Sequence, residues 1–229
     1  MYSFGCENKK IEIEINDPHD HRSLPVILIN CDYEESKLIS ERLSELNCPD
    51  HILVIISGMN WNDDLTPWRA DPIFKKSDPF SGKADEYLKF ITDRLLPEIN
   101  SYLNSIGKEI EYYALGGYSL AGLFALYAAY KCDTFRRIAS SSGSLWYPGI
   151  KDFVLNNEIS SNVDKICFSL GDKESQTRNE MMSKVENNTI EICNHLKNKI
   201  KAAYFVNEGN HFKDPDLRTA KDIKYILED

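Results

Sequence analysis

The sequence lacks the segments that carry a chain into or across a membrane. The first residues, MYSFGCENKKIEIEI, contain no continuous apolar run of the kind found in signal peptides. No segment approaches the roughly 18 consecutive apolar residues that a membrane-spanning helix needs. We therefore expect a cytoplasmic protein with no membrane partner.

Paired cysteines and nucleotide-binding motifs are also missing. The six cysteines lie far apart, and no two of them form a CxxC motif. This spacing predicts reduced and mostly buried thiols, and it argues against a disulfide framework or a cysteine-based metal site. The absence of a GxxxxGK[ST] motif excludes P-loop phosphate chemistry. We expect no metal and no cofactor.

The chain has fewer basic residues (27 Lys and Arg) than acidic ones (36 Asp and Glu). The net charge is -9 at pH 7, and the isoelectric point is about 5.1. Such a chain is a poor partner for nucleic acid or for an anionic membrane surface. Its 229 residues, 42% of them hydrophobic, suit one domain that spans residues 1–229 and has a full core.

Short apolar runs alternate with amphipathic segments along the chain. Strands are predicted at 10–15, 24–30, 51–57, 111–116, 135–142, 165–170 and 202–209. Helices are predicted at 33–47, 84–105, 119–131, 176–200 and 215–228. This alternation predicts an α/β fold with a mostly parallel sheet and helices on both faces. The strict alternation of KIEIEI (10–15) is typical of an exposed or edge strand.

A single serine lies where a predicted strand meets a predicted helix. The segment Gly117-Tyr118-Ser119-Leu120-Ala121 matches the nucleophile elbow G-x-S-x-G, with alanine in place of the second glycine. The turn is so tight that residues two positions from the serine must be small, and Gly117 and Ala121 are. A serine can also simply cap a helix, so the functional interpretation depends on partners further along the chain.

A nucleophilic serine needs a base and an acid, which follow it in the order acid then histidine in this type of fold. His211 lies between the last predicted strand and the last predicted helix, where a loop can bring an imidazole to the strand ends. The other histidines, His19, His21, His51 and His195, are expected to be structural or exposed. The acid is predicted in the loop after strand 165–170, where Glu174 is favoured and Asp172 is the alternative.

An oxyanion formed at the serine needs two backbone N–H donors. Leu120, directly after the serine, is the first candidate. The second is expected in the loop after strand 24–30, where we assign Asp32, with Cys31 as the alternative.

Several segments together resemble the putative esterase family of α/β-hydrolases, which includes enterochelin esterases, S-formylglutathione hydrolase, feruloyl esterases and mycolyltransferases. The segments that carry the resemblance lie between about residue 24 and residue 212, and they read PVILINCDY, DDLTPWRAD, YLKFITDRLLPEI, GGYSLAGLFALYA, SSSGSLWYP, SLGDKESQTRN and EGNHF. Asn30-Cys31 stands where the family has Asp-Gly, which puts the second oxyanion donor in question.

The resemblance implies an α/β-hydrolase fold, with Ser119 as nucleophile, His211 as base and Glu174 as acid. It also implies that Trp68 and Trp146 lie near the substrate, although Trp146 could equally pack in the core beneath its loop. The predicted function is a serine hydrolase that cleaves small carboxylic esters, with the irregular stretch 58–82 shaping the pocket. An acyltransferase with the same residues and a non-catalytic binding protein with this fold are the alternatives.

Overall fold

The structure is a computed structural model, and it describes residues 1–31, 33–73 and 78–228. Within these residues, eight strands form one sheet in the order β1-β2-β4-β3-β5-β6-β7-β8. The strands are β1 (Tyr2–Cys6), β2 (Lys9–Asn16), β3 (Ser23–Asn30), β4 (His51–Ser57), β5 (Glu109–Tyr118), β6 (Phe135–Ser141), β7 (Lys165–Gly171) and β8 (Lys201–Asn207). The six strands from β4 to β8 in this order pair in parallel, while β1 and β2 are antiparallel to their neighbours. The prediction of a mostly parallel sheet is confirmed.

The prediction that KIEIEI forms an exposed or edge strand is wrong. This segment lies in β2, which is covered on its outer edge by β1. Ile11 and Ile13 are buried, and even Glu12 is only 3% exposed. The middle of the segment is therefore covered on both faces, and the short strand β1 that closes the edge was not predicted.

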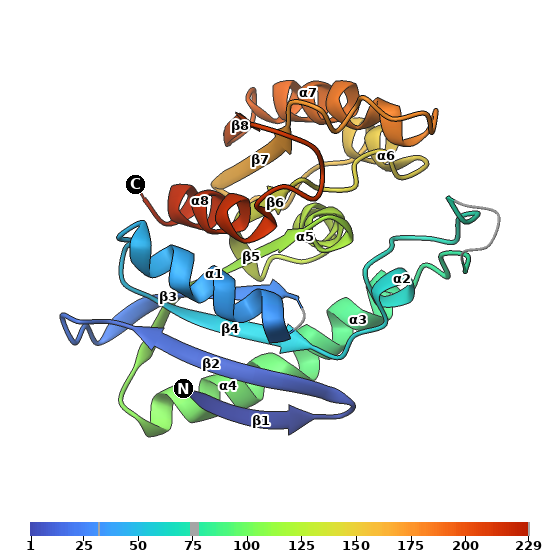
Figure 1. Cartoon of the computed structure of the whole chain (residues 1–229). Helices are drawn as coiled ribbons and strands as arrows, with labels where there is room; N and C mark the ends of the chain where they lie inside the picture. The colour runs from blue at the N-terminus through green and yellow to red at the C-terminus, as the bar shows by residue number, and fades with distance from the viewer. Residues whose placement is uncertain (32, 74–77, 229) are drawn as a thin grey trace.

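Helices cover both faces of the sheet, as predicted (Figure 1). They are α1 (Tyr33–Glu45), α2 (Trp61–Asp64), α3 (Ala84–Phe90), α4 (Leu96–Ser105), α5 (Leu120–Lys131), α6 (Ile150–Asn156), α7 (Val185–Leu196) and α8 (Pro215–Leu227). Alternate residues of each central strand point to opposite faces. In β3, for example, Ile27 and Ile29 pack with α1 and α8, whereas Val26 and Leu28 pack with the cluster that contains α3, α4 and α5.

Two predicted helices are interrupted. The segment 84–105 contains a π-helical turn, Ile91–Leu95, between α3 and α4. Pro97 lies just after this turn, and its missing N–H prevents one α-helical hydrogen bond there. In the predicted helix 176–200, only α7 and the preceding 3₁₀ turn Met182–Lys184 are helical.

The cysteines of the chain are mostly buried, as their spacing predicts. All six cysteines are free thiols, and five of them are buried. None of the helices in the described part of the chain is long and apolar enough to cross a membrane.

The parallel strands bring three connections to one edge of the sheet. Ser119 follows β5, Glu174 lies three residues beyond the end of β7, and His211 lies four residues beyond the end of β8. Because parallel strands end at the same edge, the loops that follow them meet there. The fold therefore places the predicted serine, acid and histidine within reach of one another.

Candidate active site

Ser119 has the strained backbone of a nucleophile elbow. Its φ of 57° and ψ of -121° lie in a region that non-glycine residues rarely occupy. Backbone bonds fix it there: its N–H donates to the Ser141 carbonyl at 3.1 Å, and its own carbonyl accepts from Leu123 and Ser144. A Cβ at Gly117 would lie 2.4 Å from the Cβ of Ala121, so the tight turn excludes any larger residue at that position.

Ser119, His211 and Glu174 form one hydrogen-bonded chain. The Oγ of Ser119 lies 3.1 Å from Nε2 of His211, and Nδ1 of His211 lies 2.7 Å from Oε2 of Glu174. A carboxylate can only accept at this position, so Nδ1 carries the proton and Nε2 is left to accept the proton of the serine hydroxyl. The arrangement can therefore take a proton from Ser119 and stabilise the resulting imidazolium.

Glu174 is buried but remains ionised. Its side chain is 3% exposed, and burial raises the pKa of such a group. Hydrogen bonds from His211, the Gly171 N–H and the Ser142 hydroxyl outweigh burial, so the pKa of Glu174 lies below its ordinary value. Its Oε1 atom accepts the N–H of Gly171 at 2.6 Å and the hydroxyl of Ser142 at 2.7 Å.

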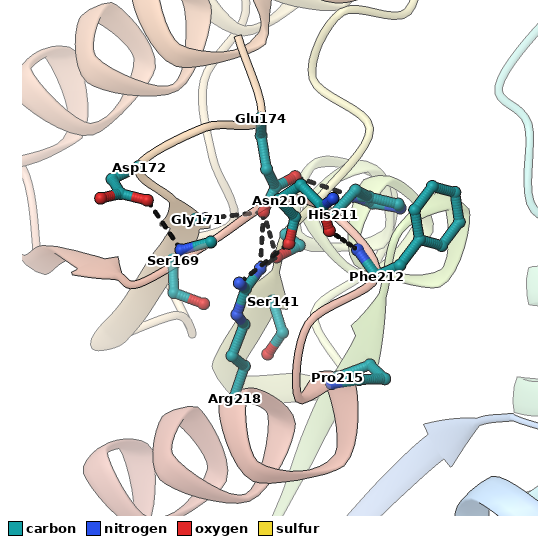
Figure 2. A network of polar contacts seen from close by, with 12 residues as sticks. Ser141, Ser169, Gly171, Asp172, Glu174, Asn210, His211, Phe212, Pro215 and Arg218 are labelled. Carbon is teal, nitrogen blue, oxygen red and sulfur yellow. Dashed lines mark hydrogen bonds and ion pairs between the residues drawn. The ribbon is translucent and has the colours of Figure 1, made fainter. Parts of the chain in front are cut away.

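Arg218 of α8 ties the acid loop to the histidine loop. Figure 2 shows its guanidinium rising from the helix toward Glu174 and Asn210. Nη1 donates to Glu174 Oε1 at 2.8 Å, and Nη2 donates to the carbonyls of Glu208 and Asn210, each at 2.9 Å. The residue is 2% exposed. A buried guanidinium therefore balances the carboxylate charge and holds the backbone on both sides of Gly209.

Asp172, the alternative acid, makes no contact with His211 among the described interactions. Its Oδ1 accepts the N–H of Gly209 at 2.7 Å, and in Figure 2 its carboxylate points away from His211. The structure thus brings Glu174, and not Asp172, to the imidazole.

The other histidines lie away from Ser119. His51 is buried at the start of β4, where its Nδ1 bonds the Pro49 carbonyl, and burial lowers its pKa. His195 lies in α7. His19 and His21 are exposed and contact Asp50.

The structure supports one of the candidate oxyanion donors and excludes another. Leu120 lines the cavity that contains Ser119. The N–H of Cys31 already donates to the Ile56 carbonyl at 3.2 Å, which removes this alternative because the donor is used in the sheet. Asp32 lies outside the described residues.

A cavity of about 340 Å³ opens above Ser119 and His211. Its lining is mainly aromatic and apolar, with a few polar groups, and comprises Trp61, Asn62, Ile73, Asp78, Phe80, Ser119, Leu120, Ser144, Trp146, Met182, His211 and Phe212. Five of these residues, Trp61, Asn62, Ile73, Asp78 and Phe80, come from the irregular stretch 58–82, as predicted for a segment that shapes the pocket.

Of the two predicted tryptophans, only Trp146 reaches this cavity. It is 8% exposed, so it both packs in the core and forms part of the cavity wall. Trp68 is absent from the lining. Its indole N–H donates to the Pro148 carbonyl at 2.8 Å, and its ring packs against Tyr127, Tyr147 and Phe153, which fixes it as a support beneath the neighbouring loop.

Sequence reasoning missed the residues that hold the acid and the histidine. Tyr118 donates its hydroxyl to the His211 carbonyl at 2.6 Å, and Ser144 places its Oγ 3.2 Å from that of Ser119. Arg218 could have been recognised, because it lies four residues before Asp222 and eight before Ile226, on the buried face of an amphipathic helix. A charged pair on such a face signals a buried polar network.

The family relationship of the chain is decided by its match to a family model. The model described as "Putative esterase" matches residues 8–214. The chain belongs to this esterase family. Membership supports carboxylic ester hydrolysis as the general reaction.

The chain is also similar to an uncharacterised protein, YbbA of Bacillus subtilis, with 26% identity over 164 residues. That alignment covers 71% of this chain and 65% of the relative, so the match spans slightly less than two thirds of the relative's length.

Solved structures share the whole fold. An IroE-like serine hydrolase from Shewanella oneidensis superposes with a TM-score of 0.79 and 18% identity, over 96% of this chain and 75% of that one. The siderophore hydrolase EstB from Aspergillus nidulans gives a TM-score of 0.78 and 19% identity, over 99% and 94% of the two chains. These similarities confirm the predicted α/β-hydrolase fold.

Proposed function

We propose that this protein is a serine esterase that cleaves carboxylic esters through an acyl-enzyme formed on Ser119. The observation that carries the proposal is the hydrogen-bonded chain from Ser119 through His211 to Glu174 at the base of an apolar cavity. Membership of the esterase family supports the same reaction.

The first half-reaction begins with the serine hydroxyl. His211 Nε2 accepts its proton as Ser119 Oγ attacks the acyl carbonyl, and the imidazolium then gives this proton to the leaving alcohol. A water molecule, activated by the same nitrogen, attacks the acyl-enzyme and releases the acid. The negative carbonyl oxygen is held by the N–H of Leu120 and, in our proposal, by the N–H of Asp32.

Glu174 acts by orientation and charge. It fixes the Nδ1–H tautomer of His211 and stabilises the imidazolium that forms during each half-reaction. Because its pKa is lowered by its hydrogen-bond donors, the carboxylate stays ionised throughout the pH range in which His211 can act as a base.

The cavity favours an ester with an apolar or aromatic group next to the carbonyl. Trp61, Phe80 and Trp146 offer ring surfaces, while the hydroxyl of Ser144 and the imidazole of His211 lie next to Ser119. A wider and more polar hollow of about 640 Å³ shares Trp146 with this cavity. We propose that it accommodates the larger part of a substrate whose acyl carbonyl reaches Ser119.

Hydrolysis of short-chain p-nitrophenyl esters tests the proposal. The parent should turn over these esters, and Ser119→Ala should lower kcat by a factor of roughly 10⁴ to 10⁶. Ser101→Ala, which changes an exposed serine of α4, should retain the parent rate. Equal rates in the parent and in Ser119→Ala would overturn the proposal, as would a parent with no activity toward any ester in the panel.

A further inference from the structure

Two imidazoles converge on one carboxylate at the edge of the sheet opposite Ser119. The Nδ1 of His19 lies 2.7 Å from Oδ2 of Asp50, and the Nδ1 of His21 lies 3.0 Å from the same oxygen. The three atoms all lie within 4.8 Å of one another. A fourth group is adjacent, since Oδ1 of Asp17 lies 3.1 Å from Nδ1 of His21.

The fold brings these residues together from two connections. Asn16, at the end of β2, pairs with His51, at the start of β4, so the residues just beyond each strand meet. Asp17 to His21 belong to the turn between β2 and β3, and Asp50 ends the connection between α1 and β4. The arrangement is therefore set by strand register.

Lys108 makes the turn rigid without joining the convergent atoms. Its ammonium donates to Oδ2 of Asp17 at 2.7 Å, to Asp20 at 2.9 Å and to the His21 carbonyl at 2.8 Å. The Asp17 side chain is 1% exposed. Burial raises its pKa, but the bonds from Lys108 and His21 dominate and hold the pKa well below its usual range.

We propose that His19, His21 and Asp50 bind a divalent transition-metal ion such as Zn²⁺, with Asp17 as a supporting carboxylate. Imidazole nitrogen and carboxylate oxygen are the donor types that Zn²⁺ takes at about 2.0 to 2.2 Å. With bonds of that length, tetrahedral ligand atoms lie about 3.4 Å apart. The nitrogen-to-oxygen distances of 2.7 and 3.0 Å need to widen by about 0.7 and 0.4 Å to match.

The side chains have the freedom for this adjustment. Those of His19 and His21 are 71% and 55% exposed, whereas that of Asp50 is 16% exposed. The two exposed imidazoles thus have room to adjust around the more buried carboxylate. Each ring needs only to carry its proton on Nε2 for Nδ1 to become a ligand.

The ion would have a structural role, because it would cross-link two connections of the chain. It joins the β2–β3 turn to the connection before β4, at the amino-terminal edge of the parallel strands, and Ser119 lies at the carboxyl-terminal edge. Binding therefore stabilises the folded chain and leaves ester hydrolysis unchanged.

Isothermal titration with Zn²⁺ near pH 7.5 tests this site on the full chain. Cys132 is the single cysteine that is not buried, so the titrations use a Cys132→Ser background under reducing conditions. The expected result is binding of one ion per chain, no heat with Mg²⁺, and a rise in the melting temperature on addition of Zn²⁺.

Three variants locate the binding. His19→Gln/His21→Gln should weaken Zn²⁺ affinity about 100-fold or abolish it, and Asp50→Asn should weaken it roughly 10-fold or more. His195→Gln, which changes a histidine of α7, should bind as the background does. Zn²⁺ affinity that is equal in the double variant and the background, or no binding to the background at 100-fold excess of ion, would overturn the proposal.

Discussion

Two successive turns of α8 each contribute to a buried polar network, and each network contains a carboxylate that is removed from water. Arg218 of the first turn faces Glu174, and Asp222 of the next turn faces the hydroxyls of Ser141 and Ser169. Both carboxylates are nearly inaccessible, with the Glu174 side chain 3% exposed and Asp222 2% exposed. Their pKa values nevertheless shift in opposite directions.

The difference lies in the charge and number of the donors. Burial raises the pKa of Asp222 to about 6, because two serine hydroxyls offset only part of the lost hydration. At Glu174 the imidazole, a backbone N–H and a hydroxyl outweigh burial, and the guanidinium supplies a neutralising charge. More donors, together with a neighbouring guanidinium, therefore keep Glu174 ionised, whereas two hydroxyls do not do the same for Asp222.

Among changes to these two networks, the largest effect is expected from removing the charge of Glu174. Glu174→Gln should lower kcat by up to about 10⁴, because the amide can present a donor to Nδ1 and favour the wrong imidazole tautomer. Ester hydrolysis by purified variants measures this effect. Asp172→Asn is the matched control, and its kcat should stay within a few-fold of the parent, whereas a larger loss in Asp172→Asn than in Glu174→Gln would assign the acid to Asp172.

Removing Arg218 should disrupt its buried ion pair with Glu174. Arg218→Met leaves Glu174 buried beside no cation, and loss of one partner of a buried ion pair costs about 3 to 5 kcal/mol. Urea denaturation should show this loss of stability, together with reduced kcat. Arg218→Lys restores the charge but not the paired donors, so it should recover part of the stability. A stable and fully active Arg218→Met would show that the guanidinium does not hold the acid.

Asp222 should give the stability of the molecule a pH dependence opposite in sign to that of Glu174, because the pKa of Glu174 is lowered on folding. Its pKa is raised from 3.8 to about 6 on folding, so the folded protein binds the proton more tightly than the unfolded chain does. The protonated group thus stabilises the fold below about pH 4, and this contribution, about 3 kcal/mol, is lost as the pH rises to about 6.

Comparison with Asp222→Asn isolates that contribution. The difference in the free energy of unfolding between this variant and the parent should change by about 3 kcal/mol between pH 4 and pH 7, in favour of the variant at the higher pH. A constant difference across this range would mean that Asp222 is as easily ionised as an exposed aspartate.

Tyr118 should have the smallest effect. Burial raises the pKa of its hydroxyl to about 12, so the group remains a neutral donor to the His211 carbonyl. Tyr118→Phe removes this bond and should cost about 0.5 to 1.5 kcal/mol of stability, with a modest fall in kcat. Thermal denaturation and ester hydrolysis measure the two effects, and a loss comparable to that of Arg218→Met would contradict this ranking.

The sequence predicted the elements that depend on strong periodicity and local chemistry. The strands β3 and β4 are apolar runs rich in valine and isoleucine, and the elbow needs a small residue at Gly117, so both were recognisable from neighbouring residues alone. Predicted order along the chain also paired His211 with Ser119, which the fold brings within 3.1 Å.

The remaining features depend on contacts between distant segments. The strand β1 is defined by its pairing with β2 rather than by its own composition. Trp68 lies in the segment DDLTPWRAD, which resembles the esterase family. Its ring packs against Tyr127, Tyr147 and Phe153 instead of lining the cavity. Arg218 follows Glu174 by 44 residues, and no local pattern reveals which carboxylate a buried arginine will meet.

Covalent labelling of Ser119 tests the central proposal most directly. The protein is incubated with a fluorophosphonate, its intact mass is measured, and the modified peptide is mapped. An adduct of one label per chain on Ser119, absent from Ser119→Ala and strongly slowed in His211→Gln, is the predicted result. An unlabelled parent, or a label on another serine that persists in Ser119→Ala, would contradict the assignment of Ser119 as the nucleophile.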